Sequence, residues 1–181
     1  TVEGFENTTG PDPLPSTNWT LGTGNWTVFT TGTTEPSTRW EVNTAAANVY
    51  QGLNAARSNR GQVNQNTTFS NYLVSPLVNI PSNGELHFFT RLFQNGNQFT
   101  LFKIMIAPQG ADLSLPGSYT LAQQWTELDL LSGAFNVYQE KVVDLAALGL
   151  VGSQIHIAFV MEDTQENASP NSDRWLIDDV S

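Results

Sequence analysis

The strand-type periodicity of its second half most constrains what this chain can fold into. Along residues 154–161 every second side chain is large and apolar: Ile155, Ile157, Phe159 and Met161. Because alternate residues of a strand point to opposite faces, this stripe faces one core. The opposite face is mostly apolar as well, so we expect a central strand covered on both sides. Residues 137–145 lack such a stripe and carry charges, which predicts an edge strand.

Similar but shorter patterns recur along the rest of the chain. Alternating or β-branched and aromatic runs, each bounded by Gly, Pro, Asn or Ser, occupy residues 25–30, 38–42, 72–80, 84–93 and 98–108. A helical spacing is visible only weakly at 120–131, and 142–150 indicates a single turn after a strand. Roughly eight to ten strands in one chain of this length predict an all-β fold, a two-sheet antiparallel jelly-roll sandwich. We expect a single domain over residues 1–181.

The net charge and the composition limit the kinds of partner that this chain can bind. Seventeen acidic residues against seven basic ones give a net charge of −10, which would repel a phosphate backbone and an anionic membrane surface. No apolar run is long enough to span a bilayer, so we expect neither nucleic-acid binding nor membrane insertion. Charged residues make up only 13%, with Asn, Thr, Ser and Gln in their place, a composition typical of exported proteins. Without cysteine there is no disulfide, thiol nucleophile or thiolate metal site.

The order of segments along the chain resembles a known family. The segments are GFEN, LPSTNW, NWTVFT, NAARSN, YLVSPLVNI, LHFFTRL, VVDL, QIHIAFV and WLIDDV, from Phe5 to Val180. This set is similar to the cleaved-adhesin or choice-of-anchor J family, distant relatives of MAM domains. The resemblance implies a galactose-binding-like or MAM-like jelly roll, secreted or displayed on the surface of Gram-negative gut and oral bacteria.

Modules of the resembled family often stand, without catalysing a reaction, beside protease or glycan-handling domains. We therefore expect this chain to be a monomeric part of a larger surface protein, and its last strand-like segment, WLIDDVS, suggests a neighbouring domain. The segment 110–125 departs from the better-known adhesin sequences. Ligand specificity therefore cannot be transferred from the family.

Carboxylates at the two ends of the chain form a candidate metal site. Glu6 stands near the start, and Asp178 and Asp179 stand near the end. The first and last strands of a jelly roll commonly run side by side, and calcium takes six to eight oxygen ligands, including carboxylates and main-chain carbonyls. The resembled family often holds a structural calcium ion in this region. The alternative is a group of strand-end carboxylates that face water.

A second acidic stretch covers residues 162–173, EDTQENASPNSD. It lacks the central Gly and closing Glu of an EF-hand loop, so any cation here would be bound irregularly. Polar loops of this composition are common on sandwiches, which favours a solvated loop over a metal site.

Tryptophan offers both core residues and sugar platforms. Trp26, Trp40 and Trp175 lie within strand patterns and are predicted to be in the core, because burying a large ring removes much apolar area from water. Trp19 and Trp125 lie at loop margins, where a flat ring can stack on a sugar. With Asn167 in the last long loop, these two residues are the candidate ligand-binding side chains.

No catalytic residues are predicted. His87 and His156 stand in mid-strand, and the chain has neither a GxSxG nor an HExxH motif. The leading hypothesis is a non-catalytic module that binds a glycan or a host surface protein and holds a structural calcium ion. The alternatives are a structural spacer domain of a secreted protease or glycan-degrading protein, and a hydrolase, which needs only two carboxylates across a cleft.

Overall fold

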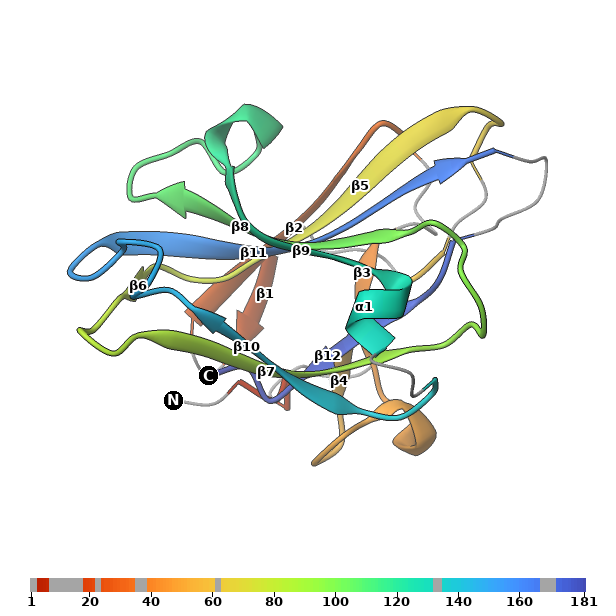
Figure 1. Ribbon diagram of the computed structural model, residues 1–181, viewed down its shortest axis with the longest axis horizontal. Coiled ribbons are helices and arrows are strands. Elements are labelled where there is room, and N and C mark those ends of the chain that lie inside the picture. The colour runs from red at the N-terminus through yellow and green to blue at the C-terminus, as the bar shows by residue number, and fades with distance from the viewer. Residues whose placement is uncertain are drawn as a thin grey trace.

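The chain folds into two antiparallel β-sheets packed face to face as a jelly-roll sandwich, which confirms the predicted fold class. A computed structural model describes residues 3–6, 18–21, 24–34, 39–60, 63–131, 135–166 and 172–181, with backbone alone for 18–21 and 131. In Figure 1 the two sheets form separate layers, with the short helix α1 at one end between them.

The larger sheet has seven strands. Its order is β1 (Asn18–Leu21), β2 (Gly24–Thr31), β5 (Thr67–Val74), β11 (Gln154–Gln165), β8 (Leu101–Pro108) and β9 (Thr120–Thr126), and the short β6 (Val78–Asn79) pairs with β11 beyond the end of β5. The central position predicted for the 154–161 segment is confirmed, because β11 pairs with β5 on one side and β8 on the other.

The smaller sheet has five strands. Its order is β10 (Gln139–Asp144), β7 (Glu85–Leu92), β12 (Trp175–Asp178), β4 (Ala55–Ser58) and β3 (Trp40–Asn43). The edge position predicted for 137–145 is confirmed, since β10 has only β7 as a neighbour. Helical structure in the described residues is limited to α1 (Glu127–Leu131), η2 (Ala46–Asn48) and η3 (Pro116–Ser118). None of these helices has the length and apolar character needed to cross a membrane.

The structure contains more strands than the sequence pattern predicted. Twelve strands are described, and the additional ones include β1, β4 and β9. Both β1 and β9 lie at edges of the larger sheet. An edge strand has a neighbour on one side only, so it buries less apolar surface and shows a weaker pattern. Segment 120–131, where the helical spacing was weak, divides into β9 and the five-residue α1.

Aromatic rings fill the space between the sheets. Trp26, Trp40 and Trp175 are at most 2% exposed, which confirms their predicted core position. Trp175 contacts Trp40 and Phe102 at centroid distances of 5.4 and 5.2 Å. These tilted and edge-on contacts are the arrangements that aromatic pairs favour.

The outer face of the larger sheet carries a second apolar cluster. Tyr72 stacks on Phe29 at a centroid distance of 4.3 Å, and both rings contact Tyr119. Tyr119 belongs to the segment in which the chain departs from the resembled family, and Leu113 of this segment also packs against the cluster. Segment 110–119 therefore covers part of this outer face.

The two ends of the chain are joined by main-chain pairing. Glu3 and Val180 exchange two backbone hydrogen bonds of 2.8 and 3.0 Å, and Ser181 and His87 exchange two of 2.9 Å. This pairing brings the first described residues beside the last ones.

The packing of the core predicts how much stability is lost when one of its aromatic rings is removed. Phe159 is fully buried between the sheets and contacts Phe88 at 5.1 Å, so Phe159→Ala should lower the free energy of unfolding by about 3–5 kcal/mol. Urea unfolding followed by circular dichroism measures this change. The control Val151→Ala alters a side chain that is 50% exposed and should shift the value by at most about 0.5 kcal/mol. A loss below about 1 kcal/mol for Phe159→Ala would contradict the packing described above.

Candidate functional site

Three acidic side chains from the two ends of the chain lie around Gly4. A Cβ atom added to Gly4 would lie 3.2 Å from Asp179 Oδ1, 3.6 Å from Glu6 Cγ and 3.7 Å from Asp178 Oδ1. We call Glu6, Asp178 and Asp179 the terminal carboxylate cluster. The sequence predicted the same three residues, and the pairing of Glu3 with Val180 is the physical reason for their proximity.

The terminal carboxylate cluster holds the backbone of loop 50–54. Asp178 Oδ2 accepts hydrogen bonds from the N–H groups of Tyr50 at 3.0 Å and Gln51 at 3.3 Å. Both carboxylate oxygens of Glu6 accept the N–H of Leu53, at 2.9 and 3.0 Å. Gly52 has a φ of +80°, and a Cβ there would lie 2.0 Å from Glu6 Oε1, so only glycine fits this approach. The carboxylates thus accept backbone N–H groups of loop 50–54 that have no partner in a β-sheet.

The electrostatics of the cluster favour a cation. Burial raises the pKa of Asp178 to about 7, and the charge of Asp179 adds to the shift. Burial and then the charge of Glu6 raise the pKa of Asp179. In the described part of the chain, no lysine or arginine pairs with these three carboxylates. The negative charges therefore repel one another without a compensating side chain.

The backbone around these carboxylates is also unusual. Phe5 and Asp179 are non-glycine residues with φ of +59° and +46°, in the left-handed region that costs free energy. Across the residues described, no three His, Asp or Glu side chains form a metal site by themselves. An ion bound here would take part of its shell from main-chain carbonyls or water, which calcium accepts.

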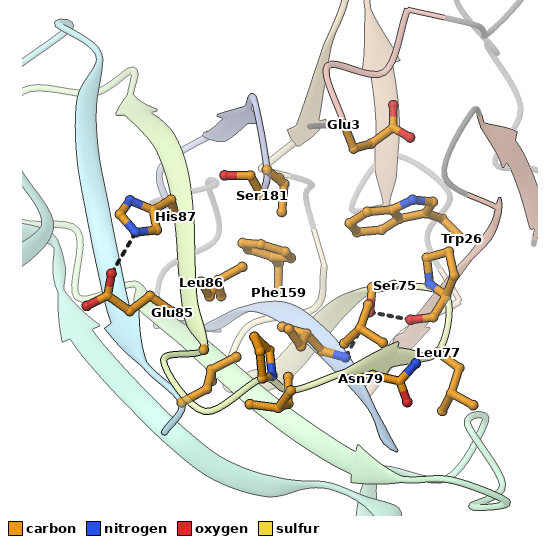
Figure 2. Close-up of a pocket in the computed structure, with 18 of the residues that line it drawn as sticks. Glu3, Trp26, Ser75, Leu77, Asn79, Glu85, Leu86, His87, Phe159 and Ser181 are labelled. Carbon is orange, nitrogen blue, oxygen red and sulfur yellow. Dashed lines mark hydrogen bonds and ion pairs between the residues drawn. The ribbon is translucent and has the colours of Figure 1, made fainter. Parts of the chain in front are cut away.

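A cavity of about 850 Å³ opens at the same end of the sandwich. Figure 2 shows Trp26 and Phe159 in its interior, with Leu77 and Asn79 on one side, His87 and Glu85 on the other, and Ser181 and Glu3 from the chain ends. Trp26 and Phe159 are at most 2% exposed, so they form a wall and not a stacking surface. We call this space the end cavity.

Polar groups lie along the rim of the end cavity. The side chains of Asn79 and Asn83 are exposed, and in the described structure their amides have no internal hydrogen-bond partner. His87 Nε2 lies 3.1 Å from Glu85 Oε2, and its Nδ1 lies 2.8 Å from Glu140 Oε1. Apolar walls with a few polar groups at the mouth are typical of small-ligand sites, and the volume is within their usual range.

The structure does not bring the predicted ligand-binding residues together. Trp19 lies on β1 and Trp125 on β9, which are opposite edges of the larger sheet, five strand spacings or about 24 Å apart. The backbone of Trp19 pairs with Trp26, a wall residue of the end cavity. Trp125 is half-buried and its ring meets Phe88 edge-on at 6.1 Å. Asn167 lies outside the described residues.

The composition of the second acidic stretch, residues 162–173, favoured a solvated loop, and the structure differs from that prediction. Asp163 is only 3% exposed and Asp173 is fully buried, so both ends of this stretch are inside the protein. The residue types at 162–173 are those of a loop, but β11 extends through Gln165 and carries Asp163 on its inner face. Sequence reasoning also missed the cavity rim, although Pro76, Pro81 and Gly84 mark the turns that form it.

Comparisons with known proteins agree with this architecture. No protein-family profile matches the sequence, and no curated protein matches it. The K2 cleaved adhesin domain of Lys-gingipain superposes with a TM-score of 0.63 at 18% identity, over 99% of this chain and 95% of that one. The K3 cleaved adhesin domain of Lys-gingipain from Porphyromonas gingivalis gives 0.61 at 16% identity, with the same coverage.

A further solved structure comes from work on the promiscuous specificity of carbohydrate-binding modules of the β-sandwich superfamily. It gives a TM-score of 0.54 at 12% identity, over 86% of this chain and 56% of that one. At these identities the similarity establishes the fold. The chain has the β-sandwich fold found in cleaved adhesin domains and in carbohydrate-binding modules.

The two carboxylates beside His87 predict its titration. The hydrogen bond to Glu140, followed by that to Glu85, raises the pKa of His87 above its ordinary value of 6.5, because both stabilise the charged imidazolium. Histidine NMR titration should place this pKa above 6.5, and Glu140→Gln should lower it. Asp144→Asn, an exposed change on the same strand, should leave it unchanged. A His87 pKa at or below 6.5 in the wild type would contradict the geometry.

Proposed function

We propose that this protein is a non-catalytic binding module of a secreted or cell-surface bacterial protein, and that it binds a glycan in the end cavity. The observation that supports this proposal is the cavity itself, which has a volume of about 850 Å³, apolar walls and exposed amides at its mouth. Amide side chains donate and accept hydrogen bonds at once, which matches the hydroxyl groups of a sugar. Exposed apolar side chains of the lining, such as Leu77, can contact the C–H faces of the sugar ring.

The proposal includes a structural calcium ion at the terminal carboxylate cluster. Glu6, Asp178 and Asp179 supply only oxygen donors and lie in a strained, negatively charged segment. Hard oxygen ligands select calcium or magnesium over transition metals, and an irregular shell favours calcium. The ion would act on structure, because it would neutralise the carboxylates that hold loop 50–54.

Membership of the choice-of-anchor J family is part of the same proposal, supported by the shared fold and by the ordered segments from GFEN to WLIDDV. An extracellular location is supported by the cleaved adhesin domains, which come from a bacterial protease. Glycan is favoured over a host surface protein as the ligand, because the proposed site is concave and small. A spacer role without a ligand, and a hydrolase, remain the competing functions.

Ligand binding predicts a response of tryptophan fluorescence. Trp26 lines the end cavity, so a bound glycan should change the emission, with a weak Kd on the order of 0.1–1 mM for a single module. Asn79→Ala combined with Asn83→Ala should weaken binding at least tenfold, because each loses hydrogen bonds to the ligand. A panel of host and dietary glycans, followed by fluorescence and calorimetry, measures this effect.

Matched variants separate the competing surfaces. Asn64→Ala changes an exposed asparagine outside the cavity lining and should leave the Kd unchanged. Trp19→Ala and Trp125→Ala test the two platform residues that the sequence indicated. No binding by any glycan would favour the spacer, and turnover of a glycan or peptide by the purified protein would favour the hydrolase.

Calcium binding predicts a lower melting temperature on chelation. A ligand that binds only the folded state stabilises it by about 2.7 kcal/mol at a hundredfold excess over Kd. Asp179→Ala should therefore melt lower than the wild type in calcium and respond less to added calcium. Differential scanning calorimetry with and without a chelator measures both effects. If chelation leaves the melting curve of the wild type unchanged, the calcium proposal is wrong.

A further inference from the structure

Buried carboxylates also gather at the opposite end of β12. On the inner face of the larger sheet, Asp163 of β11, Thr100 before β8 and Glu127 after β9 stand side by side. Glu162 pairs with Leu101, and Leu101 pairs with Thr126. Asp163, Thr100 and Glu127 are the next residues in the same register. Cβ atoms directly opposite one another in antiparallel strands are about 5 Å apart, so the three side chains form a continuous row.

Asp173 joins this row from the chain entering β12. Its N–H donates to Thr100 Oγ1 at 3.1 Å. Its Oδ1 accepts the N–H groups of Phe93 at 2.9 Å and Gln94 at 2.8 Å. Glu127 accepts the N–H of Thr100 at 3.3 Å and that of Gln98. Two buried carboxylates thus hold the two ends of loop 93–100, which connects the sheets.

Several oxygen atoms here are buried without any hydrogen-bond partner in the described structure. They are Asp163 Oδ1, Asp173 Oδ2, Gln98 Oε1 and Ser172 Oγ. Asp163, Ser172 and Asp173 are at most 3% exposed, and Glu127 is fully buried. A buried acceptor left unpaired costs about 1–3 kcal/mol, and more when it is charged. The hydrogen bonds described above bring the residues that carry these oxygens together, and the unpaired oxygens indicate that a donor or a cation belongs near them.

The buried carboxylates of this region also lack a directly paired positive charge among the described residues. Burial, then the charge of Glu127, raises the pKa of Asp163 to about 6. Burial raises the pKa of Glu127 and of Asp173, and the charge of Asp173 adds to the shift at Glu127. Arg60 contributes a favourable charge to Asp173, but no described lysine or arginine forms an ion pair with these three carboxylates.

We propose that Gln98, Glu127, Asp163, Ser172 and Asp173 form a second calcium site, the inner oxygen cluster, separate from the terminal carboxylate cluster. Its donors are carboxylate, amide and hydroxyl oxygens, a set that hard cations prefer. In the described structure Glu127, Asp163 and Asp173 do not by themselves form a three-carboxylate metal site, so the amide, the hydroxyl and water would have to complete the shell. Asp173 and Asp179 flank β12, about 20 Å apart along an extended chain, so one ion cannot serve both clusters.

The bound ion would order loop 93–100. Phe99 in this loop has a φ of +67° and a side chain that is 70% exposed, and Gln98 and Thr100 on either side of it contact the cluster. Neutralising Glu127 and Asp173 removes the repulsion between the two carboxylates that anchor the loop. The site therefore controls how an exposed aromatic side chain is presented.

Counting ions on single-site variants tests the proposal. Chelator-stripped protein is titrated with calcium, and the ions per chain are measured by native mass spectrometry and calorimetry. We expect two ions for the wild type and for the exposed control Asp144→Asn, and one each for Asp163→Asn and Asp179→Asn. Equal counts for Asp163→Asn and the wild type would overturn the inner site. If the terminal site alone is absent, the wild type and Asp179→Asn bind one ion and Asp163→Asn binds none.

A second variant and a local measurement distinguish the loss of an ion from a general folding defect. Gln98→Leu removes one neutral ligand and should weaken one calcium affinity by about tenfold, the lower end of what supporting groups of a metal site contribute. Chymotrypsin cleavage after Phe99 should be slowed by calcium in the wild type and insensitive to calcium in Asp163→Asn. If calcium slows cleavage equally in both proteins, or if Asp163→Asn is stabilised with no ion bound by the wild type, the carboxyls are protonated instead and the proposal fails.

Discussion

The aromatic layer between the two sheets is the interaction on which the rest of the structure depends. Trp175 of the smaller sheet contacts Phe102 and Phe159 of the larger sheet, and Phe159 also contacts Phe88. The chain has no cysteine, so no disulfide reinforces this layer. Strand β12 is only four residues long, yet Trp175 and Ile177 place it firmly in the core. Because this short strand is held by its rings, the residues on either side of it have defined positions.

Carboxylates occupy both ends of this strand. Asp173 precedes β12 and Asp178 closes it, and each accepts backbone N–H groups from a loop that has no strand partner. A carboxylate can accept several such bonds, so it satisfies irregular backbone that a sheet cannot. The accompanying cost is buried negative charge, since both groups are fully buried. Bound cations at both ends would offset this cost and link loop order to the core.

The surfaces left open by the fold decide where a ligand can bind. Segment 110–119 covers part of the outer face of the larger sheet, and loop 50–54 lies over the smaller one, where Tyr50 stacks on Phe89 at 3.8 Å. The end cavity is concave and lies beside the paired chain termini. Its walls are strands and its rim is formed by turns. A rigid scaffold with polar groups on the connecting turns is the usual arrangement for recognition.

The sequence by itself determined the strands whose side-chain alternation is strong and the rings that fill the core. The stripe in β11, the charged edge strand β10 and the buried Trp26, Trp40 and Trp175 follow from periodicity and from the apolar area of each ring. It also suggested that Glu6 could meet Asp178 and Asp179, through a family resemblance and the pairing of first and last strands.

Only the tertiary structure decided which residues meet across the sheets. It placed Trp19 and Trp125 on opposite edges, and it set Asp163, Thr100 and Glu127 in one row with Asp173 above them. Side-chain alternation is a local property that neighbouring residues reveal, whereas strand order and register depend on pairings between distant segments. The polar stretch 162–173 therefore resembled a solvated loop, although its first aspartate, Asp163, pairs with Phe69 of β5 and is buried.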